Sequence, residues 1–373
     1  MNAIVIGGGI GGLAAAIALA RAGIGVAVYE RAPVLGEVGA GITLWPNATR
    51  VLLDLGVGDA VLARGRRFHE TEIRSPSGKL LARSSFSAIE RHFDAPCIAL
   101  HRAELHRALA DAVPASTLHT GAECTSVDAE GAEVALNDGR TVAGDVVIGA
   151  DGIRSAVRAA ILPQVQPRYA GYTAFRAIAG AGGVSMPIET WGRGARFGAV
   201  PLTGERVYWF ATVNAKPGLL LAAGERQRLL LDTFGAWADP VARLIRTTPA
   251  DAILHNDIFD IAPFTPWSRG RAVLLGDAAH PTTPNLGQGA CMALESAAVL
   301  AAELSSGASV PEAIHRYERR RMRRTAAITN ESWRLGRIGQ TGNRLAAALR
   351  DLAVRVLPPG VGERRLFQLI ARS

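Results

Sequence analysis

The sequence predicts an α/β protein in which a Rossmann-like parallel sheet is interrupted by an inserted antiparallel sheet and followed by C-terminal helices. Three observations lead to this fold class. The chain opens with an apolar strand, a glycine-rich turn, a helix and a second strand. Residues 171–213 are instead rich in strand patterns with aromatic side chains. A strand–helix pattern returns at 272–305, so the first domain must be discontinuous in sequence.

The opening unit predicts a dinucleotide site. The first strand runs into Gly7, Gly9 and Gly12, which form the pattern G-x-G-x-x-G, and the second strand ends in Glu30. Gly7 permits the tight turn, Gly9 lets the backbone approach a pyrophosphate, and Gly12 allows close helix–strand packing. The following helix offers free N–H groups to the phosphates. Glu30 suits ribose hydroxyls and disfavours the 2′-phosphate of NADP, which leaves NAD or FAD.

The middle of the chain alternates between short strands and helices. A glycine-rich loop running into a short helix is expected at 36–56, where a plain βαβ unit would proceed to its third strand. There follow a hairpin at 69–84, a helix at 101–113, short strands over 117–142, a strand and helix at 144–161, helices at 224–247 and a strand at 252–259.

These elements predict three parts of the chain. The nucleotide-binding domain is discontinuous and comprises residues 1–68, 95–165 and 268–345. A sheet domain comprises residues 69–94 and 166–267, and a C-terminal helical segment comprises residues 346–373.

Composition excludes several classes of function. The net charge of +8 rests on arginine, because lysine occurs only at Lys79 and Lys216. The one dense basic run, "RYERRRMRRTAA" at 316–327, includes an acid and fits a solvated helix face. We therefore expect no nucleic-acid partner.

No segment predicts a membrane span or a metal site. No apolar run reaches the roughly 18–20 residues that a transmembrane helix needs, and the N-terminus has the pattern of a strand and turn rather than a signal peptide. Cys97, Cys124 and Cys291 are too few and too scattered for a disulfide framework or a zinc site. We expect a soluble cytoplasmic protein without membrane insertion, either a monomer or a homodimer.

The segment "AVLLGDAAHPTTPNLGQGA" at 272–290 predicts the second half of the site. Asp277 stands at the carboxyl end of a strand, where α/β proteins bind ligands. Pro281 and Pro284 stiffen the loop that follows. Gly287 and Gly289 are expected to open a helix, whose unpaired N–H groups and dipole favour an anion.

Three motifs in this order resemble a known family. They are G-x-G-x-x-G ending in Glu30, "GADGIRSAVR" at 149–158 and "GDAAHPTTPNLGQG" at 276–289. Together they are similar to the single-component FAD-dependent aromatic hydroxylases, the p-hydroxybenzoate and salicylate hydroxylase-like flavoprotein monooxygenases. The segment "WGRGARFGAVPLTGERVYWF" resembles the substrate-domain strands of the family, including its urate hydroxylase and zeaxanthin epoxidase-like branches. The resemblance covers residues 1 to about 345.

The resemblance implies which residues hold FAD. Gly7, Gly9, Gly12 and Glu30 would hold its ADP half, with Arg31 beside the adenosine. The remaining implied contacts are Thr43 and Arg102 at the ribityl and pyrophosphate region, the backbone of Cys124 at the adenine, Asp151 at the FAD site and at the docking nicotinamide cofactor, Asp277 at ribityl or phosphate oxygens, and Gly287, Gln288, Gly289, Ala290 and Cys291 under the isoalloxazine ring. The helix N-terminus there would stabilise the anionic reduced flavin.

The resemblance also implies the reaction. NADH or NADPH, bound transiently without a second Rossmann domain, would reduce FAD, and O₂ would then form a C4a-hydroperoxyflavin that transfers one oxygen to a small aromatic or conjugated substrate. Arg154 and other surface arginines are candidates for the phosphates of the nicotinamide cofactor. Arg196 and Tyr208 match positions where the urate hydroxylase-like branch contacts substrate, and they are the predicted catalytic residues. Arg176, Tyr172 and Trp45 are weaker candidates for the pocket.

His280 has the near-neutral pKa of a general base, but it has no identifiable partner. A structural role in the loop is the favoured interpretation. The alternative functions are a reductase or dehydrogenase of the geranylgeranyl reductase type, an epoxidase, and a redox-responsive binding protein. A flavin-dependent halogenase is disfavoured because no W-x-W-x-I-P segment occurs.

Overall fold

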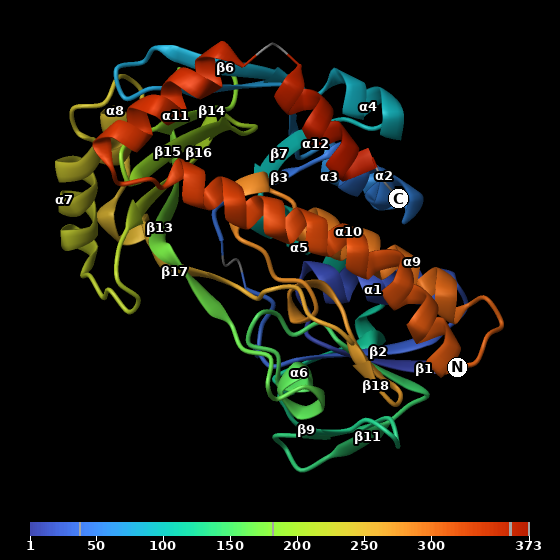
Figure 1. Ribbon diagram of the computed structural model, residues 1–373. Coiled ribbons are helices and arrows are strands. Elements are labelled where there is room, and N and C mark those ends of the chain that lie inside the picture. The colour runs from blue at the N-terminus through green and yellow to red at the C-terminus, as the bar shows by residue number, and fades with distance from the viewer. Residues whose placement is uncertain (37–38, 181–182, 358–359, 372–373) are drawn as a thin grey trace.

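In the computed structural model, six strands from separate stretches of the chain form one sheet in the order β18-β19-β12-β1-β2-β8 (Figure 1). All neighbours in this sheet are parallel except β18 and β19. The central strands are buried on both faces, which explains their continuous apolar sequences. The strands are β1 (Asn2–Ile6), β2 (Gly25–Glu30), β8 (Leu118–Thr120), β12 (Val146–Gly149), β18 (Ser268–Arg269) and β19 (Ala272–Leu274).

The structure describes residues 1–36, 39–180, 183–357 and 360–371. Residues 37–38 of the predicted glycine-rich loop and 181–182 of the predicted insert lie outside the described residues, as do 358–359 and 372–373 of the predicted C-terminal segment.

Small side chains let helices pack closely beside this sheet. The alanine-rich helix α1 packs against α9, which is also rich in alanine, and α9 packs against the long helix α10. In Figure 1, α10 extends past both large sheets. These helices share one core with the six-stranded sheet. Their bounds are α1 (Ile10–Arg21), α5 (Arg102–Asp111), α9 (Gly289–Leu304) and α10 (Val310–Gly339).

Seven strands form a second sheet in the order β17-β13-β16-β15-β14-β5-β6. One face of this sheet packs against α7 and α8 in a separate apolar core. The elements are β5 (Glu70–Arg74), β6 (Leu80–Ser85), β13 (Arg168–Gly180), β14 (Ile188–Trp191), β15 (Ala195–Pro201), β16 (Arg206–Asn214), β17 (Leu254–Asp260), α7 (Ala223–Phe234) and α8 (Val241–Thr247).

The strands of the predicted insert at 166–267 pair antiparallel, and one pair that this sheet makes with the hairpin at 69–84 is parallel. β5 and β14 run parallel, whereas the other neighbours in this sheet are antiparallel. β5 comes from a hairpin far away in the chain, so no tight turn joins it to β14 and forces an antiparallel pair.

Two small sheets complete the fold. One has the order β3-β7-β4 and the other β11-β10-β9. The strand β3 lies in the segment predicted to be a loop and helix; only the helix α2 was expected there. The remaining elements are β3 (Gly41–Leu44), β4 (Arg66–Arg67), β7 (Ile98–His101), β9 (Cys124–Asp128), β10 (Glu133–Leu136), β11 (Thr141–Ala143), α2 (Pro46–Asp54), α3 (Gly58–Leu62), α4 (Ser87–Phe93), α6 (Ala156–Ile161), α11 (Arg344–Val356), α12 (Val361–Ala371) and the short 3₁₀ turns η1 (Ala115–Thr117), η2 (Ala250–Ala252), η3 (Gly276–Ala278) and η4 (Pro284–Leu286).

The substitution Gly12→Ala tests the close packing at the start of α1. A Cβ atom at Gly12 would lie 1.9 Å from the carbonyl oxygen of Gly7, so we expect a loss of about 1–3 kcal/mol in the free energy of unfolding. Gly224→Ala is the matched control, because Gly224 also lies in the first turn of a helix but no described atom lies within 4 Å of its added Cβ. The control should gain about 0.5–1 kcal/mol. Urea unfolding of both variants measures the difference, and equal midpoints would contradict the packing argument.

Candidate active site

Four strand ends meet at one edge of the six-stranded sheet. The register pairs Ile6 with Tyr29 and with Gly149, and Gly149 with Leu274. Because these strands are parallel, their carboxyl ends lie together, at the edge where open α/β sheets bind ligands. The four residues predicted to hold the cofactor at this edge follow those ends, and they are Gly7, Glu30, Asp151 and Asp277.

The glycine-rich turn has the geometry that the motif predicts. Gly7 has φ +105°, and a Cβ atom there would lie 2.5 Å from the carbonyl oxygen of Ala150. Gly9 is the N-cap of α1 without a side-chain cap, and no atom of the described residues lies within 4 Å of an added Cβ. The backbone at Gly9 is therefore open to a close ligand, and the amides of the first turn of α1 are available to an anion.

Glu30 is held by the backbone beside this turn. Its carboxylate accepts hydrogen bonds from the amides of Gly8, at 2.6 Å, and Ala32, at 2.9 Å. A carboxylate has about four lone-pair sites, so two remain for ribose hydroxyls. Arg31 is exposed next to it.

Asp277 and Arg102 form the charged wall of the site. The side chain of Asp277 reaches solvent, but the protein atoms around it desolvate the carboxyl and raise its pKa. This combination is expected at the wall of a recess. The charge of Arg102 opposes this rise. Burial lowers the pKa of Arg102, Asp277 raises it, and Arg176 from the seven-stranded sheet lowers it further. The two sheets therefore contribute charges to one site.

The loop before α9 contacts β3. Gly287 has φ +63° and ends η4 in the left-handed conformation. A Cβ atom at Gly287 would lie 3.2 Å from the hydroxyl oxygen of Thr43 and 3.1 Å from Nε1 of Trp45. The predicted site residues Thr43 and Gly287 are thus brought together.

The prediction that a helix opens at Gly287 is wrong by two residues. The left-handed turn at Gly287 is incompatible with helical backbone, so α9 begins at Gly289 with Gln288 as its N-cap. Gln288 makes no side-chain cap, and the first turn contains no acid. The free amides at 289–291 can therefore receive an anion.

Two side-chain polar atoms at this helix end have no partner among the described residues. Gln288 is fully buried and its side-chain oxygen accepts a 3.1 Å hydrogen bond from Asn47. The amide nitrogen of Gln288 and the amide oxygen of Asn47 have no partner among the described residues. Buried polar groups are rarely left unpaired, so these atoms fit a polar ligand at the start of α9.

A buried charge cluster fixes Asn47 and therefore Gln288. Glu295 accepts hydrogen bonds from Asn47 at 2.9 Å, from Arg321 at 2.8 Å and from Arg324 at 2.6 Å. Burial by itself would raise the pKa of Glu295, but the two arginines and Asn47 lower it overall. Arg321 and Arg324 are 5% and 9% exposed.

This cluster corrects the interpretation of the basic run at 316–327 as a wholly solvated helix face. Two of its arginines lie inside the protein, because the four-residue repeat of a helix turns part of any such run inward. Glu295 and Asn47 were not among the predicted site residues. A single acid in the middle of the apolar sequence of α9 was the available signal.

Asp151 caps a helix at the strand end. Its carboxylate accepts hydrogen bonds from the amides of Ala156, at 2.7 Å, and Val157, at 3.2 Å. Its second oxygen has no partner among the described residues, and burial raises the pKa of the carboxyl. Burial also raises the thiol pKa of Cys124 to about 11 and of Cys291 to about 12, so both are uncharged thiols at neutral pH.

One face of the seven-stranded sheet carries the predicted substrate residues. Arg196 pairs with Thr212, and Tyr208 pairs with Val200 and Ile178. Directly paired residues point to the same side of a sheet, so Arg196 and Tyr208 share a face. The opposite face is the apolar core under α7 and α8.

Tyr208 lies where the seven-stranded sheet meets the small sheet β3-β7-β4. A Cβ atom at Gly41 of β3 would lie 2.3 Å from its ring. Burial raises the pKa of the Tyr208 hydroxyl, and the charge of Arg176 and a hydrogen bond with it oppose the rise. Arg176 also acts on the charge of Arg102, so Arg176 links Tyr208 electrostatically to Arg102 and Asp277.

Arg196 lies elsewhere on the same face. It is four residues from the partner of Tyr208 along β15, or about 13 Å. Its guanidinium is buried, 3% exposed, and donates to the side chains of Gln340, Glu189 and Asn285. Arg176 was predicted as a weaker candidate than Arg196, but Arg176 is the arginine whose charge acts on the Tyr208 hydroxyl. Asn285, Glu189 and Gln340 were missed, although Asn285 stands inside the recognised motif.

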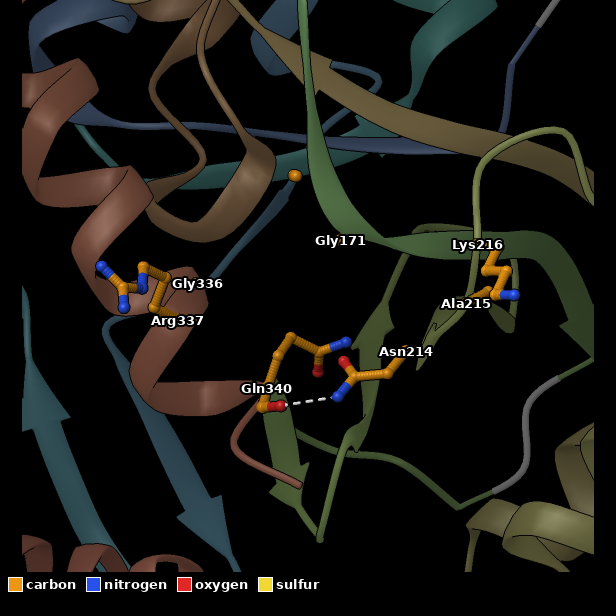
Figure 2. Close-up of a pocket in the computed structure, with 8 residues that line it drawn as sticks. Gly171, Asn214, Ala215, Lys216, Gly336, Arg337 and Gln340 are labelled. Carbon is orange, nitrogen blue, oxygen red and sulfur yellow. Dashed lines mark hydrogen bonds between the residues drawn. The ribbon is translucent and has the colours of Figure 1, made fainter. Parts of the chain in front are cut away.

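A pocket of about 530 Å³ lies at the end of β13 and β16, beside the end of α10 (Figure 2). The side chain of Asn214 donates a 2.9 Å hydrogen bond to the carbonyl oxygen of Gln340. Arg337 and Lys216 place two cations at its wall. Gln340 connects this pocket to Arg196, because its side chain accepts a 3.2 Å bond from Arg196 Nε.

His280 is a buried neutral group. It is 5% exposed, and its Nε2 lies 3.0 Å from the hydroxyl of Ser296. Burial and, to a smaller extent, Arg321 lower the pKa of His280 to about 3. A histidine that stays neutral at neutral pH and packs beside Trp267 supports the structural interpretation.

The fold and this site define an α/β protein that binds a dinucleotide at the ends of parallel strands, next to an inserted sheet with a polar face. The chain belongs to the FAD binding domain family, whose profile matches residues 1–190 and 224–332.

Relatives with known names agree with this family. The chain is 42% identical over 362 residues to the aurachin C monooxygenase/isomerase of Stigmatella aurantiaca, covering 96% of this chain and 94% of that protein. It is 38% identical over 335 residues to the FAD-dependent urate hydroxylase of Klebsiella pneumoniae, covering 86% of each. The crystal structure of Klebsiella pneumoniae HpxO with FAD and uric acid superimposes with a TM-score of 0.91 at 32% identity, covering 100% of this chain and 96% of that one.

These matches confirm the predicted family resemblance, the α/β fold and FAD as the cofactor. The chain is an FAD-dependent monooxygenase. Among the described residues, no helix is both long enough and apolar enough to cross a membrane.

The pH dependence of stability tests the buried His280. Its pKa is about 3 in the folded protein and about 6.5 when unfolded, so its neutral form contributes stability fully above pH 6.5 and progressively less as the pH falls toward 3. In that window one proton changes the free energy of unfolding by up to about 1.4 kcal/mol per pH unit. The free energy of unfolding, measured with urea at several pH values between 3 and 6.5, should fall less steeply with decreasing pH for His280→Gln than for the wild type. His315→Gln, at an exposed position, is the control, and identical slopes for all three proteins would refute the assignment.

Proposed function

We propose that this enzyme is an NAD(P)H- and O₂-dependent monooxygenase that hydroxylates a small aromatic or conjugated substrate between its two large sheets. The observation that carries the proposal is the convergence of Tyr208 and Arg176, from the seven-stranded sheet, with Arg102 and Asp277 at the strand ends. The net reaction is RH + O₂ + NAD(P)H + H⁺ → ROH + NAD(P)⁺ + H₂O.

The residues present fit FAD. The open backbone at Gly9, the spare lone pairs of Glu30 and the free amides of α9 supply complementary sites for pyrophosphate, ribose and an anionic ring edge. The unpaired amide of Gln288 adds a polar contact near that ring edge. Bound FAD supplies the redox chemistry, passing electrons from NAD(P)H to O₂, while the protein binds, orients and excludes water.

Tyr208 and Arg176 orient the substrate in this proposal. Arg176 can only donate, so a hydrogen bond from it to the Tyr208 oxygen would leave the hydroxyl proton available to a substrate oxygen. The positive charge of Arg176 then strengthens that donation, and it favours the phenolate or enolate form of the substrate, which is the more electron-rich form. Burial keeps water from competing for the same hydroxyl.

Arg196 was predicted to contact the substrate, and its contacts support a positioning role. It connects three elements, since Glu189 belongs to β14, Asn285 to η4 and Gln340 follows α10. Asn285 lies two residues before the left-handed Gly287. Arg196 thus holds the loop from which α9 begins.

The class of substrate follows from Tyr208 and Arg176, which together form a polar anchor for the substrate. A hydroxyl or carbonyl on an aromatic ring satisfies both Tyr208 and Arg176, whereas a purely apolar polyene leaves a buried hydroxyl and a cation without partners. We therefore favour ring hydroxylation over epoxidation of an alkene, and over reduction of an isoprenoid chain. Uric acid in the complex with HpxO is a ring compound of this kind.

A substrate panel tests the reaction. Purified holoenzyme with NADH or NADPH should show substrate-stimulated oxidation of the nicotinamide for hydroxylated or oxo-substituted aromatic rings, among them urate, hydroxybenzoates, 4-quinolones and indoles. With ¹⁸O₂, mass spectrometry should find one ¹⁸O atom in the product and little H₂O₂. Substrate-stimulated turnover without ¹⁸O in the product would reject the monooxygenase reaction and revive the reductase alternative.

A double-mutant cycle tests the polar anchor. Tyr208→Phe and Arg176→Gln should each lower kcat/KM by about tenfold to a hundredfold at unchanged FAD content, because each removes the same polarised donor. The double variant should lose little more than either single variant, as expected for two residues that act as a unit.

Tyr169→Phe is the matched control for this cycle. Tyr169 lies on β13, as Arg176 does, but its hydroxyl donates to the carbonyl of Ala215 at 2.8 Å, away from the recess. Its kcat/KM should match the wild type. Full activity in Tyr208→Phe, or strictly additive losses in the cycle, would remove Tyr208 from the mechanism.

A further inference from the structure

The helix α11 carries an apolar stripe on its outer side. Leu345, Leu349, Leu352 and Val356 recur at the spacing of one helix face, and they are between 53% and 74% exposed. Together with Leu357 and Val361, these residues are six of the ten large apolar side chains that stand exposed in the described residues. Contiguous apolar surface of this kind is rare on monomeric soluble proteins and marks an interaction site.

Contacts on the inner side of α11 fix the rotation of the helix about its axis, so the apolar stripe faces outward. On the inner side, Arg350 is buried and donates to the carbonyl oxygens of Gly339 and Gly192, each at 3.0 Å. Its guanidinium also lies 5.5 Å from the ring centre of Trp191. Turning the leucines inward would break these contacts and expose a buried guanidinium.

The charges around the stripe are positive. Arg344 and Arg355 lie on one edge of α11 and are exposed. The one acid of α11 and the one acid of α12 both have partners within the protein. Asp351 forms an ion pair with Arg350 at 2.7 Å, and Glu363 accepts a 2.7 Å hydrogen bond from the amide of Ser85. The edge of the stripe is therefore cationic.

An arginine-lined groove continues from the stripe. Val361, the last exposed apolar residue, also lines a groove of about 1220 Å³ between α10 and α12. Three of the arginines in its wall, Arg319, Arg323 and Arg364, have no ion-pair partner among the described residues. Both α11 and α12 pack against β6, and Figure 1 shows them, in red, along one side of the molecule.

We propose that this face, made of the α11 stripe and the arginine-lined groove, docks onto the surface of an anionic phospholipid bilayer. A phospholipid surface is both apolar and anionic, and it matches a leucine ridge that continues into a cationic groove. The stripe would lie at the level of the headgroups, parallel to the surface, and the arginines would contact phosphates. This is peripheral membrane binding without a transmembrane segment. The proposal does not depend on which substrate the enzyme takes.

A second copy of the chain fits this face less well. Antiparallel packing of two α11 stripes would place the Arg344 and Arg355 edge of one helix against the same edge of the other, and like charges repel.

Flotation of the holoenzyme with vesicles tests the proposal. Phosphatidylcholine vesicles containing a quarter phosphatidylglycerol should carry the enzyme upward in a density gradient, whereas pure phosphatidylcholine vesicles should carry little. Leu349→Ser with Leu352→Ser should weaken binding by at least about tenfold. Arg344→Gln and Arg355→Gln should each weaken binding to the anionic vesicles by about fivefold.

Leu220→Ser is the matched control, since Leu220 is 91% exposed but lies before α7, away from this face. Its binding should equal that of the wild type. The Leu352→Cys variant labelled with an environment-sensitive dye should shift its emission to the blue on anionic vesicles, and labelled Leu220→Cys should not. The three native cysteines are buried and do not compete for the label.

Three results would overturn the proposal. The first is the absence of flotation in the wild type, and a leucine-dependent dimer in sedimentation would then assign the face to a second copy. The second is undiminished flotation of the leucine variant. The third is displacement from vesicles by inorganic phosphate beyond that caused by chloride at equal ionic strength, which would assign the arginines to a free anion.

Discussion

The ion pairs of the buried carboxylate of Glu295 are the interaction on which the site depends. The first turn of α9 has neither a side-chain cap nor an acid, so the feature that makes it attractive to an anion also leaves it without local support. Glu295 supplies the support one and a half turns later, by binding two arginines of α10 and Asn47 of α2. Desolvating a carboxylate is costly, and only such a complete set of partners offsets it. The position of α9 is therefore set by charges rather than by apolar packing alone.

The second constraint is the register between β15 and β16. It places Tyr208 opposite Val200, at the end of the sheet that reaches Gly41, and it places Arg196 opposite Thr212, at the end that reaches Gln340. One face of one sheet therefore has two functions along its length. The first end completes the recess at the ends of the parallel strands, and the other end holds the loop that leads into α9.

Local patterns predicted the parts of this structure that local physics decides. The turn at Gly7, the acid at the end of β2 and the place of Asp277 follow from steric limits and from the common direction of parallel strands. The sequence left undecided what depends on contacts between distant segments. Arg176 and Arg196 point to the same face of the sheet. Only the register of β13 and β15 against β16 tells which of the two lies nearer to Tyr208. The left-handed turn that moves the start of α9 to Gly289 reflects contacts with Thr43 and Trp45.

The strong preference for arginine over lysine has a structural reason that composition alone does not reveal. Among the residues that the structure describes, five arginines are at most 9% exposed, and they are Arg158, Arg196, Arg321, Arg324 and Arg350. Each bonds to groups from other segments, and Arg158 and Arg350 reach backbone carbonyls that the secondary structure leaves unpaired. A guanidinium offers five donors in a rigid plane and is less strongly hydrated than an ammonium, so it can join several segments at a lower desolvation cost. In a fold assembled from discontinuous pieces, arginine thus serves as an internal connector, and a share of the positive charge belongs to the core rather than to the surface.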